Sequence, residues 1–314
     1  MTMREKVVVI VGPTAVGKTK LSIILAKRFA GEIINGDAMQ VYRGLNIGTA
    51  KITADEAEGV PHHLIDIRDP GEEYTAADFQ KDARRVIDEV SQRGKLPILV
   101  GGTGFYVKAA LFDYRFSSPG ADPAFRTEME NLVKKRGTAA LHERLKAIDP
   151  KSAARIHPHN IVRVIRALEV CRATGIPFSE QRHPISETPF FDTVSIGLTM
   201  DRSALYRRIN QRVDQMIQDG LLDEAHALYR RGIRTAQSVQ AIGYKELFPY
   251  FDGEVSLEEA VELLKRNTRR YAKRQLTWFR RQMAIHWFEM TDEPSGFSKT
   301  AEEIIQFIMR NLTT

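Results

Sequence analysis

One octapeptide near the N-terminus has the residue types and the spacing of a phosphate-binding loop. It comprises Gly12, Pro13, Thr14, Ala15, Val16, Gly17, Lys18 and Thr19, which fit the pattern G-x-x-x-x-G-K-[ST] at every fixed position. Glycines let successive backbone N–H groups point at an anion, and the start of a helix adds partial positive charge. Lys18 supplies a full charge, and the hydroxyl of Thr19 is placed to hold Mg²⁺. The motif predicts a site for a diphosphate or a triphosphate.

Two further polar residues are expected near this loop, because each follows a predicted strand. Asp37 comes after the segment 32–35, and Thr103 lies in a glycine-rich loop after 96–100. In open α/β sheets, ligands bind at the carboxyl ends of the strands. A carboxylate there can ligate a metal, accept a proton from a nucleophile or cap a helix. Thr103 can equally be a turn residue.

Short apolar strands and amphipathic helices alternate along most of the chain and must position these residues. The runs typical of buried parallel strands are 6–11, 32–35, 96–100, 193–200 and 285–290. A helix is predicted over 18–29, directly after the phosphate loop. Strands separated by helices imply crossover connections, so we predict a doubly wound parallel α/β sheet of the P-loop NTPase type.

The middle of the chain has a different pattern. From about 121 to 181 the apolar residues follow helical spacing, and the sequence contains no strand signal. We therefore predict an α/β catalytic core from 1–118 and 190–314, and a helical insertion domain from 119–189.

The composition restricts the class of protein. The chain has 314 residues, 43% of them hydrophobic, and a single cysteine, Cys171. One cysteine excludes an intrachain disulfide and a cysteine-cluster zinc site. No run of eighteen apolar residues occurs and the mean hydropathy is −0.31, so we expect a soluble, cytoplasmic protein without a membrane span.

The net charge of +6 mildly favours a polyanionic partner. The segment 265–281 concentrates this charge, with eight basic residues, no acidic ones and three interleaved aromatic residues. The alternative is a basic helix that pairs with acidic neighbours elsewhere in the fold.

Seven segments, taken together, resemble the bacterial tRNA dimethylallyltransferases, also called tRNA isopentenyltransferases. The resemblance runs from Val7 to about Phe288, and its motifs are GPTAVGKT at 12–19, GDAMQVYRGLNIGTAK at 36–51, PHHLID at 61–66, GGTGFY at 101–106, RALEV at 166–170, QAIGYKE at 240–246 and TRRYAKRQLTWFR at 268–280. One position departs from the family pattern, because Ala38 stands where serine is common. A hydroxyl contact from that position is therefore absent.

The resemblance implies transfer of a dimethylallyl group from dimethylallyl diphosphate to a tRNA. The acceptor would be N6 of the adenosine just 3′ of the anticodon, in tRNAs that read codons beginning with U. Asp37 would orient or deprotonate the amine, and Thr103 would hydrogen-bond near the reacting centre. The P-loop and Mg²⁺ would stabilise the leaving diphosphate. Arg212 is a candidate second cation there, or else a surface helix residue.

The resemblance also implies RNA contacts on both parts of a chain that we expect to act as a monomer. The helical insertion would bind the phosphates of the anticodon stem. Two loops of the core would contact the target adenine after it has left its stack in the anticodon loop. The candidate tRNA-binding residues are Asp37, Ala38, Met39, Gln40, Arg126, Arg163, Arg166, Arg182, Gln240, Gly243, Tyr244 and Lys245.

Two rival functions fit parts of the sequence. A small-molecule or nucleotide kinase would use the same loop and Mg²⁺, but gives no role to the motifs at 240–246 and 268–280. A non-enzymatic RNA-binding protein would explain the basic segments and leave the P-loop and Asp37 without a function.

Overall fold

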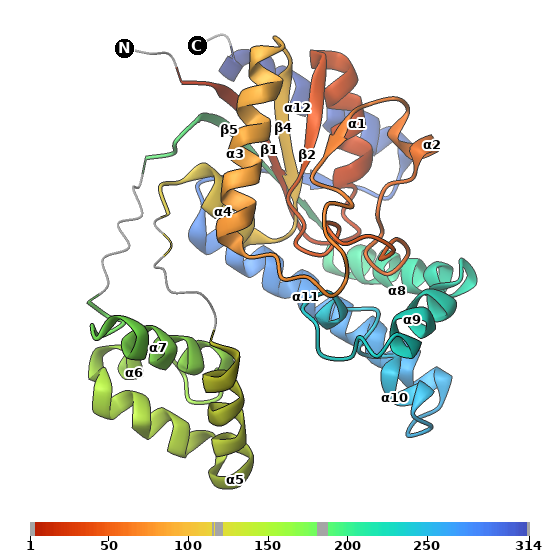
Figure 1. Ribbon diagram of the computed structural model, residues 1–314. Helices are drawn as coiled ribbons and strands as arrows, with labels where there is room; N and C mark the ends of the chain where they lie inside the picture. Colours follow the sequence, from red (N-terminus) through yellow and green to blue (C-terminus); the bar gives the residue numbers. More distant parts are fainter. Residues whose placement is uncertain (1–3, 115, 117–121, 181–187, 313–314) are drawn as a thin grey trace. The chain divides into compact units, whose positions relative to one another are not determined.

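The computed structural model describes residues 4–114, 116, 122–180 and 188–312. The chain divides into two compact units, one of Met1–Phe112 with Glu187–Thr314 and one of Asp113–Ser186. The first unit is an α/β core and the second is helical (Figure 1). The second unit overlaps the segment 119–189 that the sequence pattern sets apart.

The core contains a six-stranded parallel sheet in the order β3-β2-β4-β1-β5-β6. The strands are β1 (Lys6–Val11), β2 (Gly31–Asn35), β3 (His62–His63), β4 (Leu96–Gly101), β5 (Asp192–Met200) and β6 (His286–Met290). The predicted doubly wound α/β class is confirmed, and five strands lie where apolar runs predict them. The two-residue strand β3 was not predicted, because so short a segment carries no periodic signal.

Helices cover both faces of the sheet (Figure 1). They are α1 (Lys18–Phe29), α2 (Ala54–Ala57), α3 (Ala76–Gln92), α4 (Gly104–Leu111), α8 (Arg202–Gln218), α9 (Leu221–Arg230), α10 (Phe248–Phe251), α11 (Leu257–Gln282) and α12 (Pro294–Leu312), with a 3₁₀ turn η1 (Ser238–Gln240). None of the helices in the described residues is long and apolar enough to cross a membrane.

The first strand shows why its sequence is apolar at every position. Val7, Val9 and Val11 pack into a cluster with α3 and α4, whereas Val8 and Ile10 pack into a second cluster with α1 and α12. Successive side chains of a strand point to opposite faces. A strand that is covered on both faces therefore needs a continuous apolar run rather than an alternating one.

The helical unit contains α5 (Pro123–Ile148), α6 (Pro150–Arg155) and α7 (Ile161–Thr174). The long helix α5 is interrupted at Gly137, whose φ of 78° is not helical. The three helices enclose a small apolar core of their own that includes Phe125, Met129 and Leu168. This unit thus has the buried apolar contacts of a separate folding unit.

Candidate active site

The phosphate loop connects β1 to α1 and forms one wall of a cavity. A side chain at Gly12 would place its Cβ 2.7 Å from the backbone oxygen of Leu198, so the close approach requires glycine. Gly17, with a φ of 105°, precedes the first residue of α1. Lys18 Nζ donates hydrogen bonds to the backbone oxygens of Gly12 (3.1 Å) and Pro13 (2.8 Å). This ammonium is therefore held by its own loop.

The cavity has a volume of about 330 Å³ and collects residues from six parts of the core. Its lining includes Thr14, Lys18, Thr19, Asp37, Met39, Gln40, Gly101, Gly102, Ile209, Arg212, Val213, Met216, Gln240, Ile242, Gly243, Lys245, Leu264, Tyr271, Arg274 and Gln275. Of the phosphate loop, Thr14, Lys18 and Thr19 face the cavity. Pro13, Ala15 and Val16 belong to the same loop, but they are not among the residues that line the cavity.

Asp37 lies directly after β2 and lines the cavity. Its Oδ1 accepts a hydrogen bond from the backbone N–H of Met39 at 2.8 Å. The residues after it form turns, and the next helix begins at Ala54, so the alternative interpretation as a helix cap is wrong. Burial raises the pKa of Asp37, against the opposing effect of hydrogen bonds from Met39 and Gln40 and of the charges of Lys18 and Arg212.

Thr103 joins the loop after β4 to the loop that carries Asp37. Its Oγ1 accepts a hydrogen bond from the backbone N–H of Ala38 at 3.0 Å, and its own N–H donates to the backbone oxygen of Gly36 at 3.4 Å. Thr103 precedes α4 but makes no side-chain cap there. Ala38 is itself buried and does not line the cavity.

Two cations lie on the P-loop side of the cavity. Arg212, on α8, points Nη1 at Thr14 Oγ1 at 3.4 Å and lines the cavity, so it is not a surface helix residue. Burial lowers the pKa of Lys18 to about 8; the negative charge of Asp37 opposes this shift and the positive charge of Arg212 adds to it. Lys18, Arg212 and Asp37 therefore interact electrostatically within one cavity.

Helix α11 supplies a residue that ties the phosphate loop to the loop after β4. The buried side chain of Gln275 accepts a hydrogen bond from Thr14 N–H (2.9 Å) and donates one to the Gly102 carbonyl (2.9 Å). A Cβ at Gly102 would lie 2.2 Å from Gln275 Nε2. No local sequence signal marks this glutamine, because its partners lie 261 and 173 residues away in the chain.

We expect Gln275→Ala to lower the free energy of unfolding by about 1–3 kcal/mol, because two backbone groups lose their partner. Urea unfolding followed by circular dichroism measures this value. Gln282→Ala is the matched control, since Gln282 is an exposed glutamine of the same helix. Equal stability of the two variants would contradict the bridging role.

The loop 240–246 lines the cavity with Gln240, Gly243 and Lys245. The structure differs from the sequence-based expectation at Tyr244, whose side chain is fully buried and does not line the cavity. Its hydroxyl donates to Glu224 at 2.8 Å. Tyr244 therefore packs behind the loop instead of facing a ligand.

In the helical unit, two of the predicted RNA-binding arginines have an acidic partner. Glu169 is buried and accepts hydrogen bonds from Arg126 Nε (2.9 Å) and from Arg166 Nη1 (2.6 Å). Burial alone would raise the pKa of Glu169, but these arginines and the Asp122 N–H lower it. Arg163 is exposed on the first turn of α7, and Arg182 lies outside the described residues.

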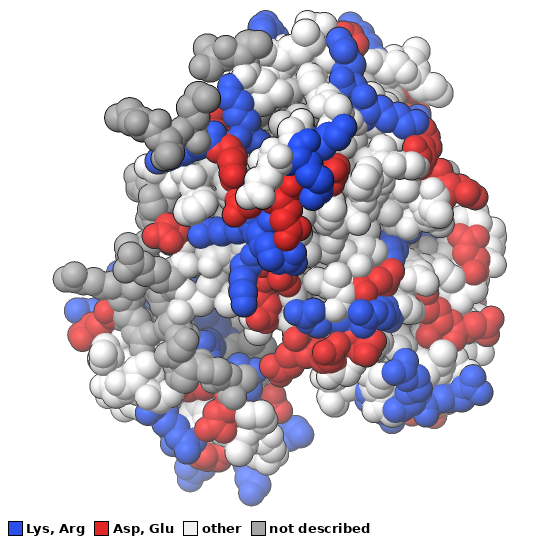
Figure 2. Space-filling view, turned by 45° about the horizontal axis from the view of Figure 1, so that its top comes forward, with Lys and Arg blue, Asp and Glu red and all other residues white. Residues whose placement is uncertain are grey.

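The basic segment of the sequence forms one exposed face of α11. Arg266, Arg270, Lys273 and Arg281 are exposed at near-helical spacing, and none of them forms an ion pair within the part of the chain that the structure describes. Among the residues that the structure describes, Lys265 alone of this segment has acidic partners, Asp214 and Glu262. On the face drawn in Figure 2, by contrast, basic and acidic side chains are interspersed.

The fold and the cavity define a P-loop type α/β protein in which residues of the P-loop and a carboxylate line one cavity. The sequence profile of the family described as IPP transferase matches residues 40–282. With this match and the relatives that follow, the chain belongs to the IPP transferase family.

The curated relatives match over nearly their whole length. A protein of Geobacillus thermodenitrificans named tRNA dimethylallyltransferase is 59% identical over 310 residues, which are 99% of this chain and 98% of the relative. A protein of Halalkalibacterium halodurans with the same name is 58% identical over 311 residues, again 99% of this chain and 98% of the relative.

Two solved structures share the fold. The full-length tRNA isopentenylpyrophosphate transferase of Bacillus halodurans has a TM-score of 0.75 and 57% sequence identity, and the match covers 99% of this chain and 97% of that chain. A eukaryotic dimethylallyltransferase described as acting on tRNA has a TM-score of 0.81 and 33% identity, covering 98% of this chain and 80% of that chain.

Proposed function

We propose that this chain is a tRNA dimethylallyltransferase. It transfers a dimethylallyl group from dimethylallyl diphosphate to N6 of the adenosine 3′-adjacent to the anticodon, in tRNAs that read codons beginning with U, and it releases diphosphate. The observation that carries this proposal is that a P-loop with two cations and a half-buried carboxylate line the same cavity. The family assignment favours this transferase over the kinase alternative.

The phosphate side of the cavity suits a leaving group. When the bond between the donor's first carbon and its bridging oxygen breaks, the electron pair goes to the diphosphate. Lys18 and Arg212 lie where they would stabilise that developing charge. On this proposal, Lys18 leaves the backbone oxygens of Gly12 and Pro13 and binds the diphosphate instead.

The donor set near the loop fits a magnesium ion that is held mainly by its substrate. Thr19 is exposed on the first turn of α1 and lines the cavity, and no cluster of three acidic, histidine or cysteine side chains suited to a metal occurs among the described residues. Mg²⁺ in phosphate sites commonly takes few protein ligands and several from phosphate and water. We propose that Thr19 holds Mg²⁺, which supplies further charge stabilisation for the diphosphate.

Asp37 is the proposed general base. As the adenine N6 forms its bond to the donor carbon, one N6 proton must leave, and the Asp37 carboxylate would accept it. A carboxylate with a raised pKa is a stronger base once it is ionised, and Lys18 and Arg212 favour ionisation. Thr103 would hold the Asp37 loop through its bond to the N–H of Ala38.

For RNA binding we propose the cavity loops, the exposed face of α11 and Arg163. The loops supply Met39, Gln40, Gln240 and Lys245 beside the reacting centre. Basic side chains that form no ion pair with another described residue suit the phosphates of an RNA stem, since RNA helices are bound largely through backbone and shape. A loop adenosine can leave its stack at modest free-energy cost. We further propose that the protein acts as a monomer in the cytoplasm.

We expect the pH profile to report Lys18 and Asp37. Lys18 must be protonated to bind diphosphate, so kcat/KM for the donor should fall as the pH rises through about 8. Asp37 must be ionised, so the rate should fall at acidic pH, below a pKa raised above 3.8. At saturating donor, kcat should stay constant up to a higher pH than kcat/KM does, because bound diphosphate stabilises the protonated form of Lys18. A kcat/KM that stays constant well above pH 8 would contradict the role of Lys18.

The function is tested by incubating the protein with an unmodified tRNA transcript and either dimethylallyl diphosphate or ATP. Mass spectrometry of the RNA digest should show an adenosine that carries one dimethylallyl group, only with the first donor. A phosphorylated small molecule or nucleotide, with ATP consumed and the tRNA unchanged, would support a kinase instead.

A further inference from the structure

A carboxylate outside the cavity holds three consecutive backbone amides of a cavity loop. Glu224, in the first turn of α9, accepts hydrogen bonds through Oε2 from the N–H groups of Asn46 (2.8 Å) and Ile47 (2.9 Å). Its Oε1 accepts from the N–H of Gly48 (3.0 Å) and from the hydroxyl of Tyr244 (2.8 Å). Hydrogen bonds to an ionised acceptor are the stronger kind, so this one carboxylate ties together two separate loops.

The two loops, 36–51 and 240–246, are in close contact where Glu224 holds them. A Cβ on Gly48 would lie 2.6 Å from the ring of Tyr244. Gly243, with a φ of +119°, would place a Cβ 3.4 Å from the Cα of Gly48. A side chain at Gly48 would have to displace the ring of Tyr244, and the positive φ of Gly243 favours glycine, so the two loops lie close together.

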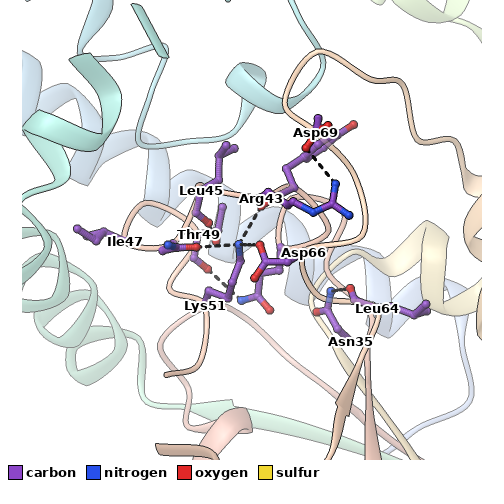
Figure 3. A network of polar contacts seen from close by, with 12 residues as sticks. Asn35, Arg43, Leu45, Ile47, Thr49, Lys51, Leu64, Asp66 and Asp69 are labelled. Carbon is purple, nitrogen blue, oxygen red and sulfur yellow. Dashed lines mark hydrogen bonds and ion pairs between the residues drawn. The ribbon is translucent and has the colours of Figure 1, made fainter. Parts of the chain in front are cut away.

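Contacts inside the loop 36–51 connect the held amides to the residues beside Asp37. Gln40 Nε2 donates to the backbone oxygens of Thr49 (3.0 Å) and Ala50 (3.3 Å). Thr49 Oγ1 in turn donates to the backbone oxygen of Leu45 at 2.6 Å (Figure 3). Fixing residues 46–48 therefore also restricts Gln40, which lines the cavity three residues after Asp37.

The same network is braced on its other side by Lys51. Its ammonium donates to the backbone oxygen of Tyr42 (2.8 Å) and pairs with Asp66 at 2.5 Å (Figure 3). Within the loop 240–246, Glu246 accepts from the Gly243 N–H and from Asn267 of α11, both at 3.0 Å. Each loop thus has its own anchor, and Glu224 is the group that joins the two.

We propose that Glu224 is a positioning residue, which holds the loops 36–51 and 240–246 at one separation so that the RNA side of the cavity is formed before tRNA binds. This inference rests on the proposed function for its kinetic consequence. Both loops line the cavity, but Glu224 and Tyr244 do not, so Glu224 acts through the loops and touches no substrate. We call the hydrogen bonds of Glu224 to residues 46–48 and to Tyr244 the clamp. The P-loop side of the cavity, which is built from β1, α1 and α8, makes none of these contacts.

Glu224→Gln tests the clamp directly, because glutamine keeps the size but exchanges one acceptor oxygen for a donor. Asp223→Asn is the matched control, since Asp223 is the exposed acid one residue earlier on the same helical turn. Hydrogen–deuterium exchange should show the amides of 46–48 exchanging about 10- to 100-fold faster in Glu224→Gln. Exchange in the phosphate loop 12–19 should not change, and Asp223→Asn should match the wild type.

Kinetics then separate positioning from general stability. For Glu224→Gln we expect kcat/KM for tRNA to fall about 10- to 100-fold, with an unchanged Kd for inorganic diphosphate. Tyr244→Phe removes one hydroxyl, keeps the buried ring and should give a smaller effect of the same pattern. It serves as the test variant if Glu224→Gln does not fold.

Three results would overturn the inference. They are unchanged exchange at 46–48, an equal loss of diphosphate and tRNA binding, or wild-type tRNA kinetics in a variant whose loops exchange faster. A wild-type protein that leaves tRNA unmodified would instead count against the proposed function, and the exchange experiment would still decide whether the clamp exists.

Discussion

Asp37→Asn is expected to lower the single-turnover rate of tRNA prenylation by about 10²- to 10⁴-fold, the usual contribution of a general base. Asparagine keeps the size and one acceptor oxygen, so the hydrogen bond from the Met39 N–H can persist. The asparagine side chain cannot, however, accept the N6 proton of the adenine. Affinity for tRNA should change little, because many phosphate contacts contribute to binding.

The stability of Asp37→Asn gives a second, independent readout. Burial raises the pKa of Asp37 above its ordinary value, so at neutral pH the ionised carboxylate opposes folding. The variant should therefore melt no lower than the wild type. Asp69→Asn is the control, since Asp69 is an acid of the same region that pairs with Arg43 at 2.9 Å and does not line the cavity (Figure 3). A near-normal rate in Asp37→Asn would end its assignment as the base, whereas an equal loss of tRNA affinity and rate would make it a residue that orients the adenine.

Lys18→Ala is expected to reduce kcat/KM for dimethylallyl diphosphate by about 30- to 1000-fold, equivalent to about 2–4 kcal/mol, because a contact to the leaving diphosphate is lost. The acid side of the pH profile should also move to higher pH, since the charge of Lys18 lowers the pKa of Asp37. A variant that only damaged folding would not produce that shift.

Lys20→Ala is the control for this variant. Lys20 is exposed on the first turn of α1 and does not line the cavity. It should keep the wild-type kcat/KM and the wild-type pH profile. Wild-type donor kinetics in Lys18→Ala would show that the P-loop is not the donor site.

The parts of the site that could be predicted from the sequence are those with local signals. The phosphate loop has a fixed spacing, and Asp37 and Thr103 follow strands whose apolar runs are continuous because both faces of the sheet are covered. Parallel strands bring their carboxyl ends to one edge, so the shared cavity follows from the strand assignments.

The remaining site residues come from helices far along the chain. Gln275 and Tyr271 lie in the family motif at 268–280, but the spacing and charge of that basic segment do not indicate the cavity. Glu224 looks like an ordinary acid in the first turn of a helix. Their roles depend on which loops the tertiary fold places beside them, and no periodicity contains that information.

Two arginines of the helical unit have an acidic partner that their own positions in the sequence do not indicate. The family resemblance implies RNA contacts for Arg126 and Arg166, and the structure shows that both also bond to the buried Glu169. The signal that could have indicated this is Glu169 itself, an acid in the apolar helix segment RALEV, three residues after Arg166. A buried carboxylate requires cationic or N–H partners, and nearby arginines are the first candidates.

The central claim is that one cavity releases diphosphate on its P-loop side and alkylates adenine on its Asp37 side. The most direct measurement uses dimethylallyl diphosphate labelled with ¹³C in the dimethylallyl group and an unmodified tRNA that reads a codon beginning with U. We expect one label per tRNA, located by fragment mass spectrometry on N6 of the adenosine 3′ of the anticodon, with one diphosphate released per label. Label at another nucleotide, or diphosphate released without labelled RNA, would contradict the account.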